Sequence, residues 1–215
     1  MSNRMEIVFV LDRSGSMGGT ESDIVGGFNS MIAQHREQEG GALVSTVLFS
    51  DESRVLHDRV PIDRIPEMKR EDYRVGGCTA LLDAVGGAIC HIRNVHKYAR
   101  EEDRPQKTLF VVMTDGCENA SREYSNEQIK RLVKQQEETG WEFLFIGADI
   151  DAFASARGIG VRTGRAVNFS KGKDTFSDCF AAVGKVMYRV AAMPAQEALA
   201  DDEVRELFQA FGEKR

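Results

Sequence analysis

The sequence lacks any apolar run that could cross a membrane. A membrane-spanning helix needs roughly 20 consecutive apolar residues, and no segment approaches that length. The apolar stretch near the start has only about six residues and ends in an acid, so it does not resemble a secretory signal. We therefore expect no leader segment and no membrane partner.

Cysteines are few, and they follow no metal-binding or disulfide pattern. The chain of 215 residues has four cysteines, with no CxxC pair and no regular spacing. Secreted domains that depend on disulfides use many more, at conserved-looking intervals. We therefore expect reduced thiols and a cytoplasmic location.

An excess of basic residues is also missing. The formal net charge is −6, and acids and bases are mixed within segments such as "KREDYR" and "YAREEDRPQK". Surfaces that bind nucleic acid gather Lys and Arg into a patch or stripe. We therefore expect no nucleic-acid partner.

What the sequence does contain is an alternation of apolar strands and amphipathic helices. Continuous apolar runs at 6–12, 107–115 and 141–149 are typical of strands buried on both faces of a sheet. Helical spacing of apolar residues follows 20–23, covers 80–100 and recurs at 174–193. This alternation predicts an α/β fold with a mostly parallel sheet.

One strand pair should run antiparallel. The apolar segments 42–50 and 53–62 are separated only by the dipeptide "DE", which is too short for a crossover. A short edge strand is expected at 165–170.

Two helix starts carry capping signals. Thr20 with Asp23, and Ser125 with Gln128, have the spacing of a capping box, in which the first side chain and the fourth satisfy each other's backbone N–H groups. The last segment, 197–211, also has helical spacing, carried by Val204, Leu207, Phe208 and Phe211. We expect it to pack on its own domain, with a partner-binding peptide as the alternative.

Oxygen-bearing side chains follow the strands of this sheet. Asp12, Ser14 and Ser16 come after the first strand, Thr79 precedes the long helix, and Asp115 ends the "VVMTD" strand. Ligands bind open α/β sheets at the carboxyl ends of the strands, so these groups should converge. Two facing carboxylates raise each other's pKa unless a cation intervenes. Hydroxyl and carboxylate ligands suit a hard cation such as Mg²⁺.

This set resembles the metal-ion-dependent adhesion site of von Willebrand factor A domains. The resemblance rests on "DRSGS" (12–16), on a threonine preceded by glycines (Thr79) and on "TDG" (114–116), and covers roughly 5–193. It implies a Rossmann-like, doubly wound, six-stranded sheet with one antiparallel strand and helices on both faces. It also implies bound Mg²⁺ or Mn²⁺ and a protein partner that donates an Asp or Glu carboxylate. The metal ligands that it implies are Asp12, Ser14, Ser16, Thr79 and Asp115.

The resemblance also suggests a branch of the family and a domain boundary. "GGCTALLDA" and "TDGCEN" look like the intracellular bacterial branch, whose members can work beside an ATPase or in another multi-subunit machine. We assign 1–193 to the family domain and 194–215 to a C-terminal helical extension.

Simpler roles are open for several of these residues. Asp12 could cap the turn after its strand, and Thr79 could be the N-cap of the long helix. Asp83 could complement the helix dipole or hold Thr79 or a metal-bound water. Cys78 and Cys117, beside two of the ligands, could be small filler residues or could tune the site by oxidation.

The function that these features favour is a non-catalytic, Mg²⁺-dependent protein-binding module. The alternative is a metal-assisted phosphohydrolase that uses Asp12 and Asp115 around Mg²⁺. Against catalysis, the sequence has no GxxxxGK phosphate loop and no nucleophile elbow. His57, His91 and His96 all fall on elements where a general base for this site is not expected.

Overall fold

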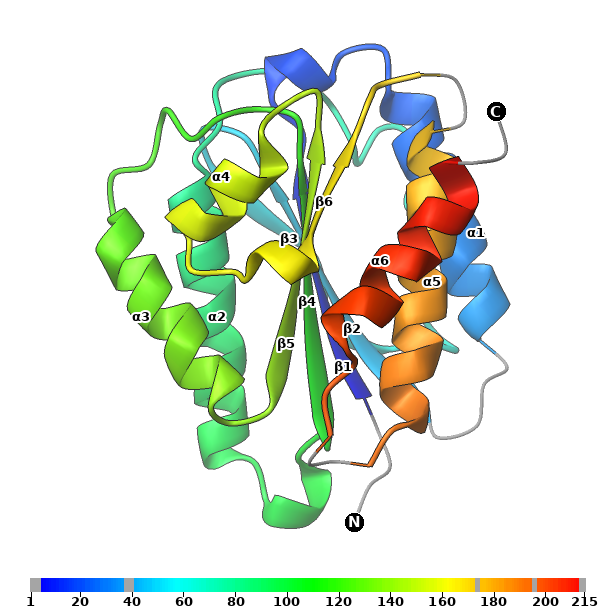
Figure 1. The fold of residues 1–215 in the computed structure, drawn as a ribbon, viewed down its shortest axis with the longest axis vertical. Helices are drawn as coiled ribbons and strands as arrows, with labels where there is room; N and C mark the ends of the chain where they lie inside the picture. Colours follow the sequence, from blue (N-terminus) through cyan, green and yellow to red (C-terminus); the bar gives the residue numbers. More distant parts are fainter. Residues whose placement is uncertain (1–4, 37–40, 173–174, 195–196, 213–215) are drawn as a thin grey trace.

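A single six-stranded sheet organises the molecule. The computed structural model describes residues 5–36, 41–172, 175–194 and 197–212 (Figure 1). The strand order is β3-β2-β1-β4-β5-β6, with β2 and β3 antiparallel and the other pairs parallel. The strands are β1 (Met5–Asp12), β2 (Ala42–Phe49), β3 (Ser53–Pro61), β4 (Lys107–Thr114), β5 (Trp141–Ala148) and β6 (Ala166–Phe169). The predicted fold class is confirmed, including the antiparallel pair around "DE".

Helices cover both faces of the sheet. In Figure 1, α1, α5 and α6 lie on one side of the strands, with α6 next to α5, and α2, α3 and α4 lie on the other. The helices are α1 (Glu21–His35), α2 (Leu81–Tyr98), α3 (Asn126–Glu137), α4 (Ala152–Gly158), α5 (Thr175–Ala192) and α6 (Asp201–Gly212). Three short 3₁₀ turns complete the described elements: η1 (Gly15–Met17), η2 (Glu101–Asp103) and η3 (Thr163–Arg165).

The central strand β1 shows why most of its residues are apolar. Alternate side chains of a strand point to opposite faces. Ile7 and Phe9 belong to the core under α1 and α5, whereas Val8 and Val10 belong to the core under α2 and α3. Because both faces are covered, a polar residue of β1 needs a specific reason. Glu6 is buried and pairs with Arg59 and His96, and the last residue, Asp12, marks the site.

The two capping signals had different outcomes. Ser125 and Gln128 form the predicted capping box at the start of α3. Thr20 is the N-cap residue of α1, but the box predicted there is wrong. The Thr20 hydroxyl instead donates to the carbonyl of Met17 at 2.6 Å, because the tight turn of η1 brings that acceptor closer.

The C-terminal helix packs on the domain, as predicted. Val204 and Phe208 of α6 are buried against the core under α5, while the side chain of Phe211 lies outside the described residues. Arg165, which is only 1% exposed, pairs with Glu142 of β5 at 2.9 Å and with Asp201 of α6 at 2.9 Å. The two ion pairs of this buried arginine connect α6 to β5.

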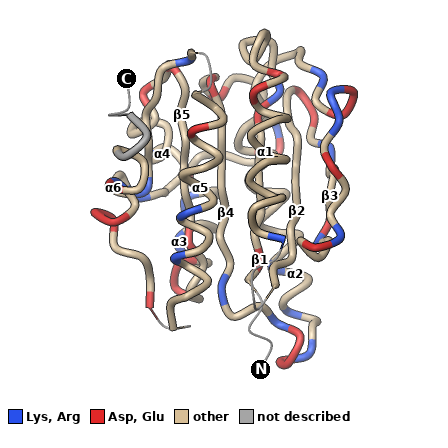
Figure 2. Tube along the Cα trace, turned by 90° about the vertical axis from the view of Figure 1, so that its right-hand side faces the viewer, with Lys and Arg blue, Asp and Glu red and all other residues tan. Residues whose placement is uncertain are grey.

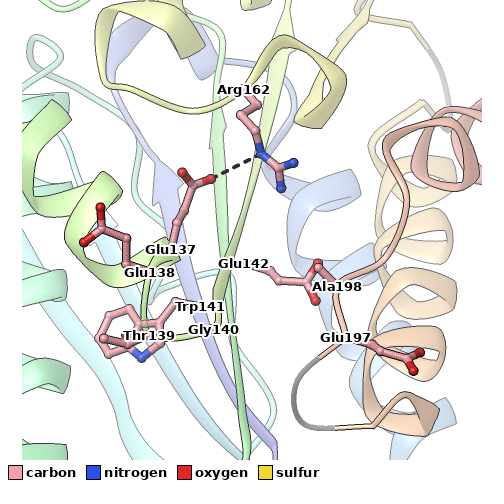
Figure 3. Close-up of a pocket in the computed structure, with 9 residues that line it drawn as sticks. All are labelled: Glu137, Glu138, Thr139, Gly140, Trp141, Glu142, Arg162, Glu197 and Ala198. Carbon is pink, nitrogen blue, oxygen red and sulfur yellow. Dashed lines mark ion pairs between the residues drawn. The ribbon is translucent and has the colours of Figure 1, made fainter.

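A pocket beside this arginine lies at the amino end of β5, the edge of the sheet opposite Asp12. Its lining includes Glu137, Glu142 and Arg162 (Figure 3). Arg162 pairs with Glu137 at 3.5 Å, and the Glu142 carboxylate pairs with Arg165. These opposite charges bind each other, so we interpret the pocket as a part of the α6 docking region.

Along the trace in Figure 2, positions of Lys and Arg are interspersed with positions of Asp and Glu. Basic and acidic residues alternate along β3 and the turn beside it, where Arg54, Asp58 and Arg59 follow one another. None of the helices in the described ranges is both long and apolar enough to cross a membrane. All four cysteines are free.

Candidate metal centre

The candidate site lies at the carboxyl ends of β1 and β4. These strands are parallel neighbours, with Leu11 opposite Met113, so Asp12 and Asp115 emerge at the same edge. The 3₁₀ turn η1 follows β1 directly and folds Ser16 back towards β4. The topology therefore brings together residues that are about 100 positions apart in the chain.

Hydrogen bonds join four of the five predicted ligands in one chain. The Ser14 backbone N–H donates to Asp12 Oδ1 at 2.7 Å. The hydroxyls of Ser14 and Ser16 lie 3.1 Å apart. The Ser16 hydroxyl donates to Asp115 Oδ1 at 2.6 Å. The alternate spacing of these hydroxyls thus places both between the two carboxylates.

Asp12 is completely buried and held by its neighbours. The Thr114 hydroxyl donates to Asp12 Oδ2 at 2.5 Å, and the Tyr73 hydroxyl donates to the Asp12 carbonyl. Burial raises the pKa of Asp12, while the hydrogen bonds from Thr114 and Ser14 oppose that rise. The charge of Asp115 raises the same pKa, but it is the smallest of these causes. Desolvation, and not the carboxylate repulsion expected from the sequence, therefore dominates at this residue.

Asp115 already has a cation beside it. The Lys171 ammonium contacts Asp115 Oδ2, and it also donates to the Ser16 carbonyl at 2.9 Å. The Asp115 side chain has no exposed surface, whereas the Lys171 side chain is 28% exposed. The site thus holds a buried carboxylate whose second oxygen is in contact with a positive charge.

Thr79 is placed by its backbone. Its N–H donates to Asn119 Oδ1 at 2.9 Å, and the Asn119 N–H donates back to the Thr79 carbonyl at 3.1 Å. A Cβ atom on Gly116 would lie only 2.6 Å from Thr79 Oγ1, so glycine at that position leaves room for this hydroxyl next to Asp115. The N-cap of α2 is Ala80, so the interpretation of Thr79 as that cap is wrong.

The glycine-rich loop before Thr79 is bound to the first motif. Gly15 N–H donates to the Gly77 carbonyl at 3.0 Å, and the Cys78 N–H donates to Asp51 Oδ1 at 3.1 Å. Gly77 has φ +81, and a Cβ atom there would lie 1.8 Å from Asp51 Oδ2. Only glycine meets both conditions, so this residue sets how closely the loop approaches the site.

The remaining candidates lie around the rim. Asp83 is in the first turn of α2, as expected, but its carboxylate accepts backbone N–H groups of Arg122, Glu123 and Tyr124. These bonds anchor the loop before α3, so Asp83 has contacts other than the predicted ones to Thr79 or a metal-bound water. Both thiols beside the ligands, Cys78 and Cys117, are exposed, which contradicts a role as core filler.

The residues present fit a hard divalent cation. Two carboxylates and three hydroxyls meet at one edge, all five offer oxygen, and the Lys171 ammonium lies on one of these carboxylates as a natural stand-in for a positive ion. The described residues contain no cluster of three or more His, Cys, Asp or Glu side chains arranged for a metal. Serine and threonine are therefore essential to any metal shell here.

Several residues that shape the site gave no signal in the sequence. Thr114 lies inside the "TDG" motif, yet its bond to Asp12 depends on the pairing of β1 with β4. Tyr73 stands in a polar segment without recognisable spacing, and Asn119 ends the quoted segment "TDGCEN" but had no predicted role. Lys171 is 155 positions from Ser16 and looks like an ordinary surface lysine.

Comparison with protein families decides the identity of the fold. The model of the von Willebrand factor type A domain matches residues 6–177. The chain belongs to the von Willebrand factor type A family. No curated protein sequence matches it significantly.

Solved structures share this von Willebrand factor A fold at low sequence identity. The vWF domain of the type V pili tip protein Mfa5 from Porphyromonas gingivalis has a TM-score of 0.62 at 11% identity, covering 94% of this chain and 99% of that one. The PilB minor pilin from Streptococcus sanguinis has a TM-score of 0.60 at 13% identity, covering 89% and 64%.

A third structural relative contains a metal. Proximal thread matrix protein 1 from the mussel byssus, in a structure with a zinc-occupied MIDAS motif, has a TM-score of 0.58 at 16% identity. The match covers 86% of this chain and 46% of that protein. This von Willebrand factor A chain therefore spans about half the length of the mussel protein.

Proposed function

We propose that this von Willebrand factor A domain is a non-catalytic, Mg²⁺-dependent or Mn²⁺-dependent protein-binding module. The observation that carries the proposal is the hydrogen-bonded chain Asp12–Ser14–Ser16–Asp115 at the carboxyl edge of the sheet. A divalent ion would replace these contacts between ligands with bonds to itself. The ligands would be the side chains of Asp12, Ser14, Ser16, Thr79 and Asp115.

The same ligand set explains why a partner carboxylate would bind. A metal held by two acidic side chains keeps an attraction for further negative charge and supplies a coordination position for an incoming Asp or Glu oxygen. Ser16 is exposed in the turn η1 that follows β1, whereas Thr79 is buried just before α2, so Ser16 is the ligand that faces outwards. The partner in this proposal is a protein, which could be part of an ATPase complex or another multi-subunit machine, in a reducing cytoplasmic setting.

No observation favours the phosphohydrolase alternative. Each described histidine is engaged elsewhere: His57 contacts Thr46, His91 contacts Asp58, His96 contacts Glu6, and His35 contacts the carbonyls of Met31 and Gly184. A hydrolase would need a general base within reach of the metal.

Affinity capture from native cells tests the proposal. The wild-type domain should retain a partner in millimolar Mg²⁺ and release it in EDTA, and the Asp12→Asn variant should retain none. Asp63→Asn removes the same charge from an exposed residue far from the site and should behave as wild type. A partner that stays bound in EDTA, or that binds Asp12→Asn equally well, would contradict a metal-dependent interface.

A further inference from the structure

The segment after β6 delivers a lysine to the candidate metal centre. β6 ends at Phe169, at the same edge of the sheet as η1 (Figure 1). The Lys171 backbone N–H donates to Asp149 Oδ1 at 3.1 Å, and the Asp149 N–H donates to the Phe169 carbonyl at 2.9 Å. Because the backbone is fixed in this way, the side chain of Lys171 is aimed across the sheet edge at Asp115.

The ammonium of Lys171 sits on the atoms that a metal would need. It contacts Asp115 Oδ2, the oxygen that the Ser16 hydroxyl leaves free, and it donates to the Ser16 carbonyl. A divalent ion bound to this oxygen could not share it with an ammonium group, because the two positive charges would repel each other at contact distance. Binding of the metal therefore requires Lys171 to leave.

We propose that Lys171 is an internal counter-ion that competes with the metal for Asp115 and so sets the metal affinity of the domain. The inference rests on the proposed metal site. The ion pair neutralises a carboxylate that has no exposed surface, which stabilises the domain when no metal is bound. The metal binds only the fraction of molecules in which Lys171 has swung away, and its apparent affinity falls by that fraction. The lysine stem, which is 28% exposed, is long and flexible enough to make this exchange.

Calorimetric Mn²⁺ titration of Lys171→Met tests the competition. The variant removes the ammonium and keeps a stem of similar length, so we expect Mn²⁺ to bind about twofold to fivefold more tightly than in wild type, on the scale of one partly exposed ion pair. Its melting temperature in EDTA should be lower. Lys134→Met, at an exposed position in the last turn of α3, removes the same charge far from the site and should leave both values unchanged.

Amine labelling of the wild-type protein gives a second readout that needs no variant. A trace of acetic anhydride, quantified for each lysine by mass spectrometry, should label Lys171 less than Lys134 in EDTA. Saturating Mg²⁺ should raise the labelling of Lys171 and leave that of Lys134 unchanged. This measurement decides the question if Lys171→Met fails to fold.

The outcomes separate this inference from the proposed function. Equal or weaker Mn²⁺ binding by Lys171→Met, or labelling of Lys171 that does not respond to Mg²⁺ in a protein that binds it, would overturn the competition and leave the metal site standing. Failure of wild type and variant alike to bind Mn²⁺ would overturn the metal site itself, and the competition with it.

Discussion

Replacing Asp12 with Asn should separate metal binding from folding. Asp12 Oδ1 accepts from the Ser14 N–H at 2.7 Å, and Oδ2 accepts from the Thr114 hydroxyl at 2.5 Å. An Asn oxygen in place of Oδ1 keeps the first bond. Its NH₂ group in place of Oδ2 would donate to the Thr114 oxygen, and that hydroxyl would turn to the Gly116 carbonyl, 3.1 Å away. Every polar group in the turn therefore keeps a partner.

The free energy of unfolding without metal should change little. Hydrogen bonds to a charged group contribute about 1.5–3 kcal/mol and neutral ones about 0.5–1.5 kcal/mol, so two weakened bonds cost about 2 kcal/mol. The substitution also removes the burial of a charge, which is the main cause of the raised pKa of Asp12 and acts against that loss. These effects oppose each other, so Asp12→Asn should lie within about 1 kcal/mol of wild type in EDTA.

Metal affinity should fall sharply in the same variant. A dication about 4 Å from a carboxylate is attracted by about 2 kcal/mol even at the dielectric constant of water, which corresponds to roughly 30-fold in affinity. Burial of Asp12 strengthens this attraction, so 30-fold is the smallest loss expected. Ser14→Ala and Thr79→Val each remove a neutral ligand and should weaken binding less.

Denaturant melts in EDTA and calorimetric Mn²⁺ titration measure the two effects separately. Asp63→Asn serves as the control for loss of one charge. A loss of more than about 2 kcal/mol in EDTA would mean that the Asp12 hydrogen bonds are structural and that capping of the turn is its main role. Mn²⁺ binding within threefold of wild type would refute Asp12 as a metal ligand.

Three further predictions concern the whole domain. Saturating Mg²⁺, at 100 times its dissociation constant, should stabilise the fold by about 2.7 kcal/mol and raise the melting temperature by several degrees. Thermal melts that coincide in EDTA and in Mg²⁺ would count against the site. Arg165→Met should lower the free energy of unfolding by about 3–5 kcal/mol because it leaves Glu142 buried without its cation. Glu142→Gln in the same chain should restore part of that loss, and substitution of an exposed arginine such as Arg64 should show no such effect. Burial lowers the pKa of His57 below its usual 6.5, so the unfolded chain binds that proton more readily than the folded protein. The free energy of unfolding should therefore decline as the pH falls below about 6.5. Urea midpoints of His57→Gln should depend less on pH in that range, and a pH dependence equal to that of wild type would refute the assignment.

The sequence allowed the prediction of features that depend on local spacing. The apolar run ending at Asp12, the "DE" connection and the capping box of Ser125 with Gln128 are each set by neighbours within a few residues, and the structure has all three. The capping box predicted at Thr20 does not form because a competing acceptor for its hydroxyl, the Met17 carbonyl, lies within the same turn. The motifs also identified residues that lie together at one edge of the sheet, although their role as metal ligands stays a prediction.

Features that depend on distant chain segments could not be predicted. Arg165 reads like any surface arginine, and its burial results from α6, which arrives 36 positions later at Asp201. Lys171 reaches Asp115 only because β6 ends at the same edge as β4. The expected repulsion between Asp12 and Asp115 proved minor for the same reason, since burial and hydrogen bonds from other elements have the larger effect on Asp12.

A crystal of the wild-type domain soaked in Mn²⁺ tests the central claim most directly. An anomalous difference map locates the ion without reference to activity or partner. The account predicts one strong peak bounded by Ser14, Ser16 and Asp115, with at least one position of its shell filled by water or by a carboxylate from solution or from a neighbouring molecule. The absence of a peak, or a shell closed entirely by side chains of this chain, would contradict a metal site that receives a partner's carboxylate.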